Sequence, residues 1–328
     1  MAAWPFISCP KRSVLGLTIV LAGLAGAARH EHALANPLEC RDLSLRYEAG
    51  KQSLADRQVN VYLMQAAQKG CRALAELLLK DGASVHTRRR EGDTALHHAV
   101  KTQQPDVAKL LLDHGANIER RDLSGATPLF LAVEANRVRT VVLLLARGAN
   151  PNTPGRSAAS PLAAAAFNGN AGLVDVLLMH GAAVDAEDTT GKTALVYAAA
   201  RGFPHIVKRL LAAGVAANRR YGNDLTALMW AAGHANDVPQ DDGVKTVDLL
   251  VERGAGLDER DNRGRTALMI AAELGRTAIV EFLLARGAQS GLTDADGKTA
   301  LDLAADDGVR AALAGYATPH RSGPRPGP

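Results

Sequence analysis

The stretch Thr94-Ala-Leu-His-His-Ala99 recurs through this chain of 328 residues at a regular interval. Its later copies are TPLFLA at Thr127, SPLAAA at Ser160, TALVYA at Thr193, TALMWA at Thr226, TALMIA at Thr266 and TALDLA at Thr299. Successive copies are 33 residues apart, except that Thr226 and Thr266 are 40 apart. A fixed period of this length indicates a stack of similar supersecondary units, each of which buries its apolar face against its neighbours.

Each unit contains the signals of two short helices. Thr127 stands where its hydroxyl can accept a hydrogen bond from a free backbone N–H at the start of the first helix. In the second helix, Val107, Leu110 and Leu111 fall on one face at spacings of three and four. Gly115 follows, and glycine readily adopts the left-handed conformation that ends many helices. The sequence therefore predicts a helix–turn–helix unit with one apolar side.

The complete pattern reads G-x-T-[AP]-L-x-x-A, then V-x-x-LL-x-x-GA, then a D-x-x-G turn. By these motifs the chain resembles the ankyrin-repeat family. The resemblance implies an all-α solenoid of 33-residue helix–turn–helix units that carry protruding β-turn fingers. It covers roughly residues 59–315, with about six full repeats and degenerate units at both ends.

The predicted organisation has four segments. They are a signal peptide (1–35), an N-terminal capping segment (36–58), the repeat array (59–315) and a Pro/Gly-rich tail (316–328) for which we expect disorder. The units of the array are predicted near 59–91, 92–124, 125–157, 158–190, 191–223, 224–263, 264–296 and 297–315.

The first 35 residues have the order of a secretory signal peptide. Lys11-Arg12 precede the apolar run 14–28, and the small residues of Ala33-Leu34-Ala35 follow, so cleavage is expected before Asn36. The apolar run is shorter than the roughly 20 residues that span a bilayer, so a retained inner-membrane anchor is the less favoured alternative. In a Gram-negative host the processed protein would be periplasmic, with secretion into the medium as the other alternative.

Two cysteines, Cys40 and Cys71, follow the predicted leader. Disulfides persist in the oxidising compartments that exported proteins enter. A Cys40–Cys71 bridge would attach the leading segment 36–57, for which we expect a capping helix, to the first unit. Two free thiols remain the alternative at this stage, because sequence does not give the geometry that a disulfide needs.

The charge balance argues against a nucleic-acid-binding protein. The chain carries a net charge of +4, of which the predicted leader contributes +2 through Lys11, Arg12, Arg29 and Glu31. The remaining +2 is close to neutral, and we expect no nucleic-acid partner and no stable membrane insertion once the leader is removed. The chain has 28 Arg against 10 Lys, which bears on the kind of protein partner because guanidinium groups bind carboxylates in a bidentate manner.

No cofactor, metal or catalytic site is expected. Gly191-Lys-Thr and Gly297-Lys-Thr lack the earlier glycine of a phosphate-binding loop. The stretch Asp294-Ala-Asp-Gly297 opens like a calcium loop but lacks its later acidic ligands, and a finger turn explains it. Adjacent His97 and His98 point in different directions on a helix, which favours structural hydrogen bonds. The sequence predicts a protein that is not an enzyme.

A protein-binding surface is the function that remains. The resemblance places partners on the concave side, formed by finger tips and the exposed edges of the first helices. The predicted partner-binding residues are Arg88, Arg89, Arg90, Asp93, Lys101, Glu134, Arg156, Phe167, Lys192, Arg201, His234, Asn262, Arg263, Arg265 and Glu273. The basic stems favour a partner with an acidic surface, although at any single finger a solvated charge is the alternative.

Alternatives to an envelope scaffold remain open. A secreted effector that binds host proteins is one, since repeat arrays of this kind are common in that role. A ligand-binding or enzymatic role centred on the insertion 233–243, which lies between two helices of one unit, is another. We expect a monomer. We also expect Phe167 to be an apolar anchor for a partner, because the resemblance implies that its position faces solvent on the concave side.

Overall fold

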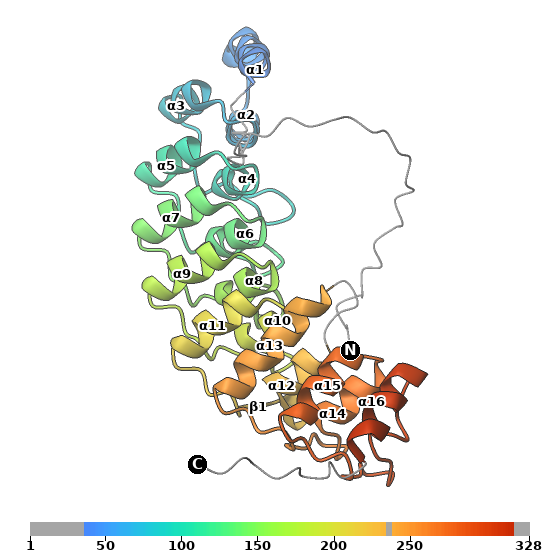
Figure 1. Ribbon diagram of the computed structural model, residues 1–328. Coiled ribbons are helices and arrows are strands. Elements are labelled where there is room, and N and C mark those ends of the chain that lie inside the picture. The colour runs from blue at the N-terminus through green and yellow to red at the C-terminus, as the bar shows by residue number, and fades with distance from the viewer. Residues whose placement is uncertain (1–35, 234–237, 318–328) are drawn as a thin grey trace, which may run out of the picture. The chain divides into compact units, whose positions relative to one another are not determined.

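The computed structural model describes residues 36–233 and 238–317. The predicted signal peptide (1–35), the candidate residue His234 and residues 318–328 of the predicted tail lie outside these ranges. The described residues form paired helices joined by short turns, with one pair of two-residue strands (Figure 1). The expected all-α repeat solenoid is therefore confirmed.

The helices are short, as the 33-residue period requires. Those of the leading segment and the first units are α1 (Pro37–Gly50), α2 (Asp56–Lys69), α3 (Arg72–Lys80), α4 (Ala95–Lys101), α5 (Pro105–Asp113), α6 (Pro128–Glu134) and α7 (Val138–Ala146). The following ones are α8 (Pro161–Phe167), α9 (Ala171–Met179), α10 (Ala194–Ala200), α11 (Pro204–Ala212), α12 (Ala227–Ala232), α13 (Gln240–Glu252), α14 (Ala267–Glu273), α15 (Thr277–Ala285) and α16 (Asp307–Ala317). Three-residue 3₁₀ turns, η1 (Lys51–Ser53), η2 (Arg156–Ala158) and η3 (Gly222–Asp224), and the antiparallel strands β1 (Arg220–Tyr221) and β2 (Leu225–Thr226) complete the list.

In four units the hydroxyl of the first residue of the repeated motif caps the first helix, at Thr127, Ser160, Thr226 and Thr266. Thr127 Oγ1 accepts a hydrogen bond from Phe130 N at 3.2 Å, and Ser160 Oγ accepts one from Ala163 N at 3.1 Å. Pro follows at the first helical position in both units, where its missing N–H costs nothing. Gly115, at φ 83°, lies just beyond α5 in the left-handed conformation.

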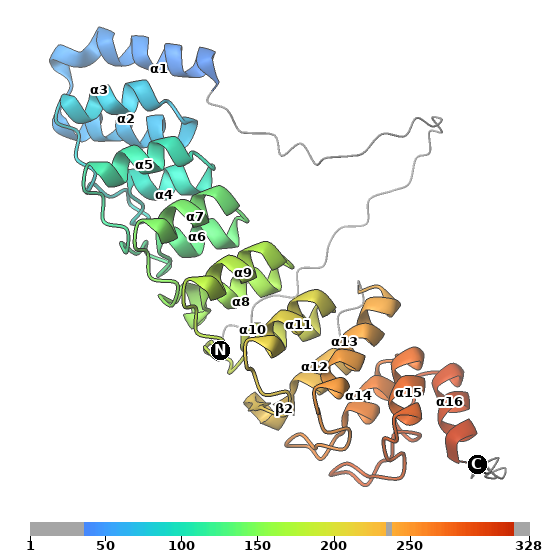
Figure 2. The ribbon, with the colours of Figure 1, turned by 60° about the vertical axis from the view of Figure 1, so that its left-hand side comes forward.

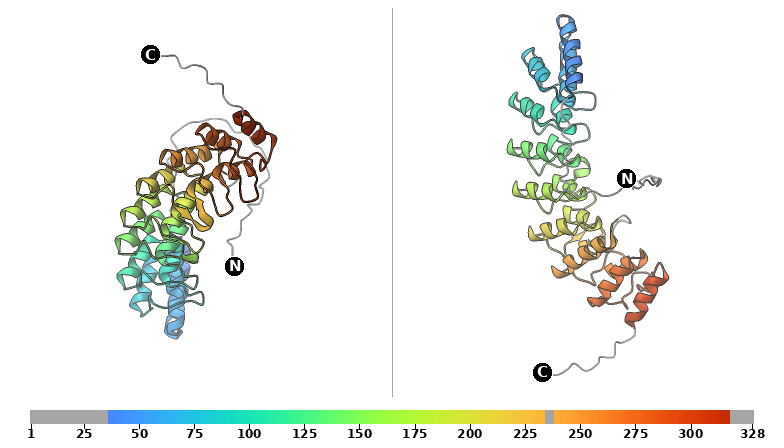
Figure 3. Two further views of the ribbon diagram at one scale, coloured as in Figure 1. Left: turned by 90° about the horizontal axis from the view of Figure 1, so that it is seen from below. Right: turned by 45° about the horizontal axis from the view of Figure 1, so that its top comes forward.

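First helices pack on first helices and second helices pack on second helices along the chain. Thus α2, α4, α6, α8, α10, α12 and α14 form one row of contacts, and α3, α5, α7, α9, α11, α13 and α15 form the other (Figure 2). In the copies of the repeated motif that begin at Thr94 through Thr266, the leucine lies in the core between the rows. These leucines are at most 1% exposed: Leu96, Leu129, Leu162, Leu195, Leu228 and Leu268. Figure 3 shows the same succession of helix pairs from two further directions.

The leading segment caps the open end of the array through α1. Leu43 and Tyr47 of α1 are buried, and the Tyr47 hydroxyl donates to Asp81 Oδ2 at 2.7 Å. Burial and the nearby Asp81 carboxylate raise the pKa of Tyr47 to about 12. A disulfide joins Cys40 of α1 to Cys71 at the start of α3, with their Cα atoms 5.3 Å apart. The cap is thus attached covalently as well as by packing.

Three local features differ from the sequence-based expectations. The insertion 233–243 is not a loop throughout, because Gln240–Gly243 forms the first turn of α13, which has 13 residues where the other second helices have nine. In the last unit, residues 300–303 form a turn instead of a first helix, and α16 runs to Ala317, two residues past the predicted end of the array. The first helix of the leading unit begins at Asp56, inside the predicted capping segment.

Candidate partner-binding surface

The fingers are built on an aspartate that folds the chain back on itself. Asp261 Oδ1 accepts hydrogen bonds from Arg263 N at 2.9 Å and Arg265 N at 2.8 Å, and its unit continues into Thr266 and α14. The same pair of backbone bonds forms at Asp122, Asp188 and Asp294. This geometry explains the D-x-x-G motif. It also identifies Asp294–Gly297 as a finger turn, since the Asp294 oxygen already binds backbone N–H groups.

Four pairs of neighbouring fingers are joined by a backbone hydrogen bond at their tips. Leu123 N donates to Glu91 O at 3.1 Å, and Ala295 N donates to Arg263 O at 2.9 Å. The equivalent bonds run from Thr189 N to Ser157 O and from Asn262 N to Asn223 O. Within these four pairs the tips are therefore held in fixed positions relative to each other. A partner that binds them would immobilise little additional backbone.

The first finger contains the run Arg88–Arg90, and all three side chains are exposed. Arg88 Nε donates to Gly92 O at 3.2 Å, so this side chain also closes its own finger. Arg89 occupies the position of the finger aspartate, and its backbone N–H bonds Asp93 O at 2.9 Å. Two guanidinium groups, those of Arg89 and Arg90, project from a finger whose backbone is already hydrogen-bonded.

Asp93, expected at a finger tip, is only 7% exposed. Its Oδ2 lies 2.8 Å from Lys101 Nζ at the end of α4, and this ion pair takes up both predicted partner-binding residues. Asp93 directly precedes the helix-capping Thr94, a position at which the chain turns inward. The expectation of an exposed tip was wrong for this reason.

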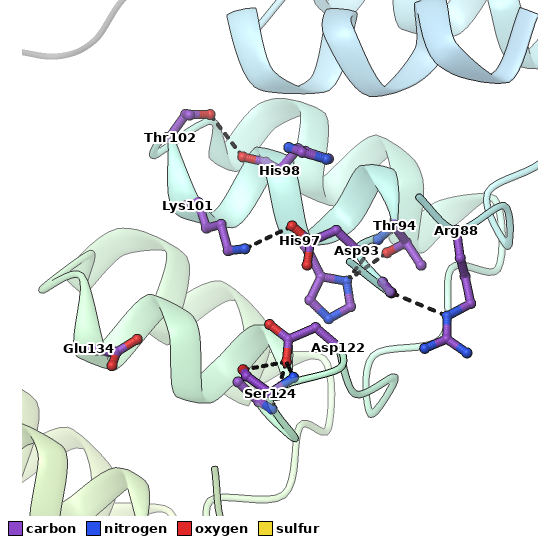
Figure 4. A network of polar contacts seen from close by, with 12 residues as sticks. Arg88, Asp93, Thr94, His97, His98, Lys101, Thr102, Asp122, Ser124 and Glu134 are labelled. Carbon is purple, nitrogen blue, oxygen red and sulfur yellow. Dashed lines mark hydrogen bonds and ion pairs between the residues drawn. The ribbon is translucent and has the colours of Figure 1, made fainter. Parts of the chain in front are cut away.

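His97 lies at the centre of a buried polar network beneath this finger (Figure 4). Its Nδ1 is 2.8 Å from Thr94 Oγ1 and accepts a hydrogen bond from Thr94 N at 3.2 Å. Burial lowers the pKa of His97, although the carboxylates of Asp93 and Asp122 oppose that shift. Burial also lowers the pKa of His98, the next residue of α4. These contacts give His97 the structural role that the sequence favoured over metal binding.

The middle units place aromatic and basic side chains together. Phe167 is half-buried, and its ring meets that of Tyr197 edge to face with centroids 5.7 Å apart. The Arg201 guanidinium carbon lies 5.2 Å from the Phe167 ring centroid, and Lys192 Nζ lies 5.3 Å from that of Trp230. Phe167 is thus packed against the next unit, which corrects the expectation of a free apolar group.

Tyr197 is fixed by the finger of its own unit. Its hydroxyl donates to Asp188, and burial together with that carboxylate raises the pKa of Tyr197. The ring packs against Phe167 of the preceding unit, and the hydroxyl also braces the finger. Trp230, at the same repeat position, is partly buried with Lys192 over its ring.

The remaining predicted residues divide between paired and exposed side chains. Glu134 pairs with Arg156 of the next finger at 3.4 Å. Arg265 pairs with Asp261 at 2.9 Å and with Glu273 at 3.1 Å, and is half-buried. Asn262 and Arg263 are exposed at the sixth finger. The structure therefore spreads the predicted residues along a row of fingers and first helices, which we call the finger-side surface, and does not gather them at one site.

Leu123 is the residue that sequence reasoning missed. It is the tip residue of the second finger and is 72% exposed, and the exposed Arg120 and Arg121 begin that finger. Arg121 Nη1 donates to Gly125 O at 3.3 Å, which repeats the contact of Arg88 with Gly92. Aligning the units would have revealed it, because Leu123 occupies the tip position that Arg90 holds in the first finger. An apolar residue at an exposed tip contributes nothing to the core.

Sites of other kinds are not found in the described ranges. The side chains of residues 36–233 and 238–317 contain no cluster of three or more His, Cys, Asp or Glu that could hold a metal ion. In the same ranges, no helix combines the length and apolar character needed to cross a membrane. Gly191-Lys-Thr is part of a finger, since Asp188 Oδ1 accepts from Lys192 N at 3.1 Å.

Comparison with known families agrees with the geometry. The family model for ankyrin repeats (3 copies) matches residues 63–154, 162–240 and 236–314. These matches cover more than half of the chain, so the chain belongs to the ankyrin-repeat family. No curated protein gives a significant match. Ankyrin repeats are generally protein–protein interaction modules and generally act as non-enzymatic binding scaffolds.

Proposed function

We propose that this chain is an exported, monomeric protein-binding module of the cell envelope that holds one partner protein on its finger-side surface. The observation that carries the proposal is the set of four tip-to-tip backbone hydrogen bonds, of which Leu123–Glu91 is the first and Ala295–Arg263 the last along the chain. These bonds preorganise a surface made of exposed and half-buried side chains from successive units. A rigid surface of this kind loses little conformational entropy when it binds.

Export is supported by two independent features. The first 35 residues have the residue order of a signal peptide. Cys40 and Cys71 form a disulfide, which persists in oxidising compartments such as the periplasm. Processing at Asn36 would leave α1, which begins at Pro37, as the first helix of the exported protein.

The binding proposal is tested by capture from envelope extract of the native host. The bait is the full chain, expressed with its own N-terminal segment and purified as the host processes it. One variant reverses charge on three fingers, R90E, K192E and R263E. The control variant reverses three charges on the second-helix side, K109E, K208E and R253E, where the side chains are exposed.

A partner retained by the wild type and the control but lost by the finger variant would support the proposal. Equal retention by both variants would place binding elsewhere and contradict it, as would the absence of any specific partner. Cell fractionation with mass spectrometry of the mature N-terminus tests the location. Asn36 in the periplasm supports it, whereas an uncleaved N-terminus in the membrane or protein in the medium would favour the anchored or the secreted alternative. Size-exclusion chromatography with light scattering tests the monomer.

A further inference from the structure

The basic fingers are not equivalent, because several arginines of the later ones are ion-paired within the fold. Arg156 pairs with Glu134 at 3.4 Å, and Arg265 pairs with both Asp261 and Glu273. At the fifth finger, Arg219 pairs with Asp185 and Glu187 at 2.9 Å, and Arg220 pairs with Glu259 at 2.5 Å. Arg219 and Arg220 join neighbouring fingers, and Arg156 and Arg265 each join a finger to a first helix. A partner could use their charge only by breaking contacts that the fold already makes.

The first two fingers are different. Arg88, Arg89, Arg90, Arg120 and Arg121 are all exposed, and within residues 36–233 and 238–317 none of the five takes part in an ion pair. The contacts of Arg88 and Arg121 are with backbone carbonyl oxygens of their own fingers, Gly92 O and Gly125 O. A carbonyl carries no net charge, so the positive charge of both groups remains uncompensated.

Nearby carboxylates are engaged elsewhere. Asp93 is bound to Lys101, and Asp122 accepts from the backbone of its own finger. Glu119 accepts from Asn150 N at 2.8 Å and from the Thr153 hydroxyl at 2.9 Å. Glu91 is the one exposed acid within the two fingers, residues 88–93 and 120–125, against five arginines. The two fingers therefore form a basic cluster, which we call the N-terminal basic cluster.

Leu123 lies within this cluster. A methyl group placed on Gly92 would stand 2.8 Å from Arg88 Nη2 and 3.1 Å from Leu123 Cγ, so the guanidinium and the leucine side chain flank the same glycine. The Leu123 backbone is fixed by its bond to Glu91 O and by the Asp122 turn. The side chain itself is 72% exposed, so most of its apolar surface is left in water. Covering such a surface is favourable for association.

We propose that the N-terminal basic cluster binds an acidic segment of a partner protein, with one apolar side chain of that segment packed on Leu123 between carboxylates that pair with the arginines. This inference rests on the proposed function and assigns its primary contact to residues 88–93 and 120–125. A protein segment fits better than a nucleic acid for two reasons. The cluster contains no aromatic side chain on which bases could stack, and a phosphate backbone offers nothing to cover Leu123.

The test uses two fluorescently labelled acidic peptides that differ at one residue. In the first, a single Leu is flanked on both sides by Glu and Asp, and in the second a Ser replaces that Leu. Binding is measured by fluorescence anisotropy with the full chain, purified as the host processes it. The variants are R89E/R90E, L123S and the matched control K208E/R253E, which makes the same charge change at exposed residues on the second-helix side.

We expect the Leu peptide to bind the wild type and the control about equally, and the R89E/R90E variant at least about tenfold more weakly. We expect L123S to bind the Leu peptide about tenfold more weakly than the wild type does, and to abolish the preference for the Leu peptide over the Ser peptide. These side chains are exposed, so circular dichroism should show every variant to be folded. Equal weakening by the control, or no effect of R89E/R90E, would overturn the proposal.

Duplex DNA and heparin separate a protein segment from a general polyanion. Binding of either that R89E/R90E abolishes and L123S leaves unchanged, with no Leu preference between the peptides, would overturn the proposal in favour of a phosphate or sulfate polyanion. Failure of this inference is distinguishable from failure of the proposed function. A captured partner that survives R89E/R90E but is lost by the three-finger variant contradicts the N-terminal site alone.

Discussion

Lys101 Nζ lies 2.8 Å from Asp93 Oδ2, and this pair joins the residue before the helix-capping Thr94 to the last residue of α4. The same two repeat positions, five units later, hold Arg265 and Glu273, whose side chains lie 3.1 Å apart with the charges exchanged. Both pairs link the end of a finger to the end of the helix that follows. Both polarities of the ion pair therefore occur at this place, and Arg265 has Asp261 as a second partner.

Exchanging the charges of the first pair should consequently be tolerated. D93R alone places a second cation beside Lys101 at a site where the native carboxylate side chain is 10% exposed, and we expect a loss of about 1–2 kcal/mol in the free energy of unfolding. The double variant D93R/K101E, which reproduces the later pair, should recover most of that loss. Urea denaturation of both single variants and the double variant gives the coupling energy. A double variant as unstable as the sum of the singles would contradict the equivalence of the two pairs.

Stability should also fall in mildly acidic solution. The pKa of His97 in the folded protein lies below the ordinary value of 6.5, mainly because of burial. The unfolded chain therefore takes up the proton first, and the free energy of unfolding decreases as the pH falls below 6.5. His98 contributes in the same direction. Thermal unfolding measured across this range should show the decrease.

The control for this effect comes from the chain itself. Two later units hold the buried Met229 and Met269 at the position of His97, so H97M is compatible with the fold. We expect this variant to lose part of the pH dependence below 6.5, and H97M with a neutral residue at His98 to lose most of it. Acid unfolding through Asp122, whose hydrogen bonds from Ser124 and Ala126 outweigh burial and lower its pKa below 3.8, lies in a separate range and should persist. An unchanged profile in H97M would show that His97 is not the group responsible.

The repeat architecture could be predicted because every unit carries its own local sequence signals for two helices and a turn. The word around Thr127, the leucine of each copy and Gly115 each specify one local conformation, and stacking makes them mutually consistent. The family match over residues 63–154, 162–240 and 236–314 shows the ankyrin repeats that the motifs predicted. Local signals of this kind need no knowledge of distant contacts.

Whether a charged side chain is exposed or ion-paired could not be predicted in the same way. Arg263 and Arg265 stand two residues apart and look alike in the sequence, yet the first is exposed and the second is bound by two carboxylates. The difference depends on which way each side chain leaves the finger and on a glutamate at the far end of α14. The insertion was misjudged for a related reason, because Gln240–Gly243 becomes helical as a continuation of α13.

Two fingers lack the glycine that the turn requires, and one of them offers a stabilising substitution. Gly92, Gly125 and Gly191 adopt φ between 73° and 83°, whereas Ala158 occupies the same position at φ 58°. A left-handed alanine is disfavoured by its Cβ, so we expect A158G to raise the free energy of unfolding by about 0.5–1 kcal/mol after the entropy of glycine is taken into account. The neighbouring A159G is the control, because Ala159 has an extended conformation and its replacement should lower stability. Urea midpoints that move together in the two variants would rule out this explanation.

Reduction of the Cys40–Cys71 disulfide should loosen the N-terminal end of the array without unfolding the rest. The bridge closes a loop between cysteines 31 residues apart, which in the chain-entropy model contributes about 3–4 kcal/mol. In a stack where each unit contacts its neighbours, that contribution acts first on α1, α2 and α3. Two contacts within the cap, from Tyr47 and Lys51 to Asp81, do not depend on the bridge and should keep α1 partly docked. We therefore expect dithiothreitol to accelerate amide hydrogen exchange in α1–α3 while α8–α12 remain protected.

The variant C40A/C71A should show the same acceleration and no further response to dithiothreitol. That variant shares every other residue with the wild type. Faster amide hydrogen exchange in α8–α12 of both the reduced wild type and the variant would mean that the cap stabilises the whole array. Identical exchange in oxidised and reduced wild type would show that the bridge does not stabilise the cap.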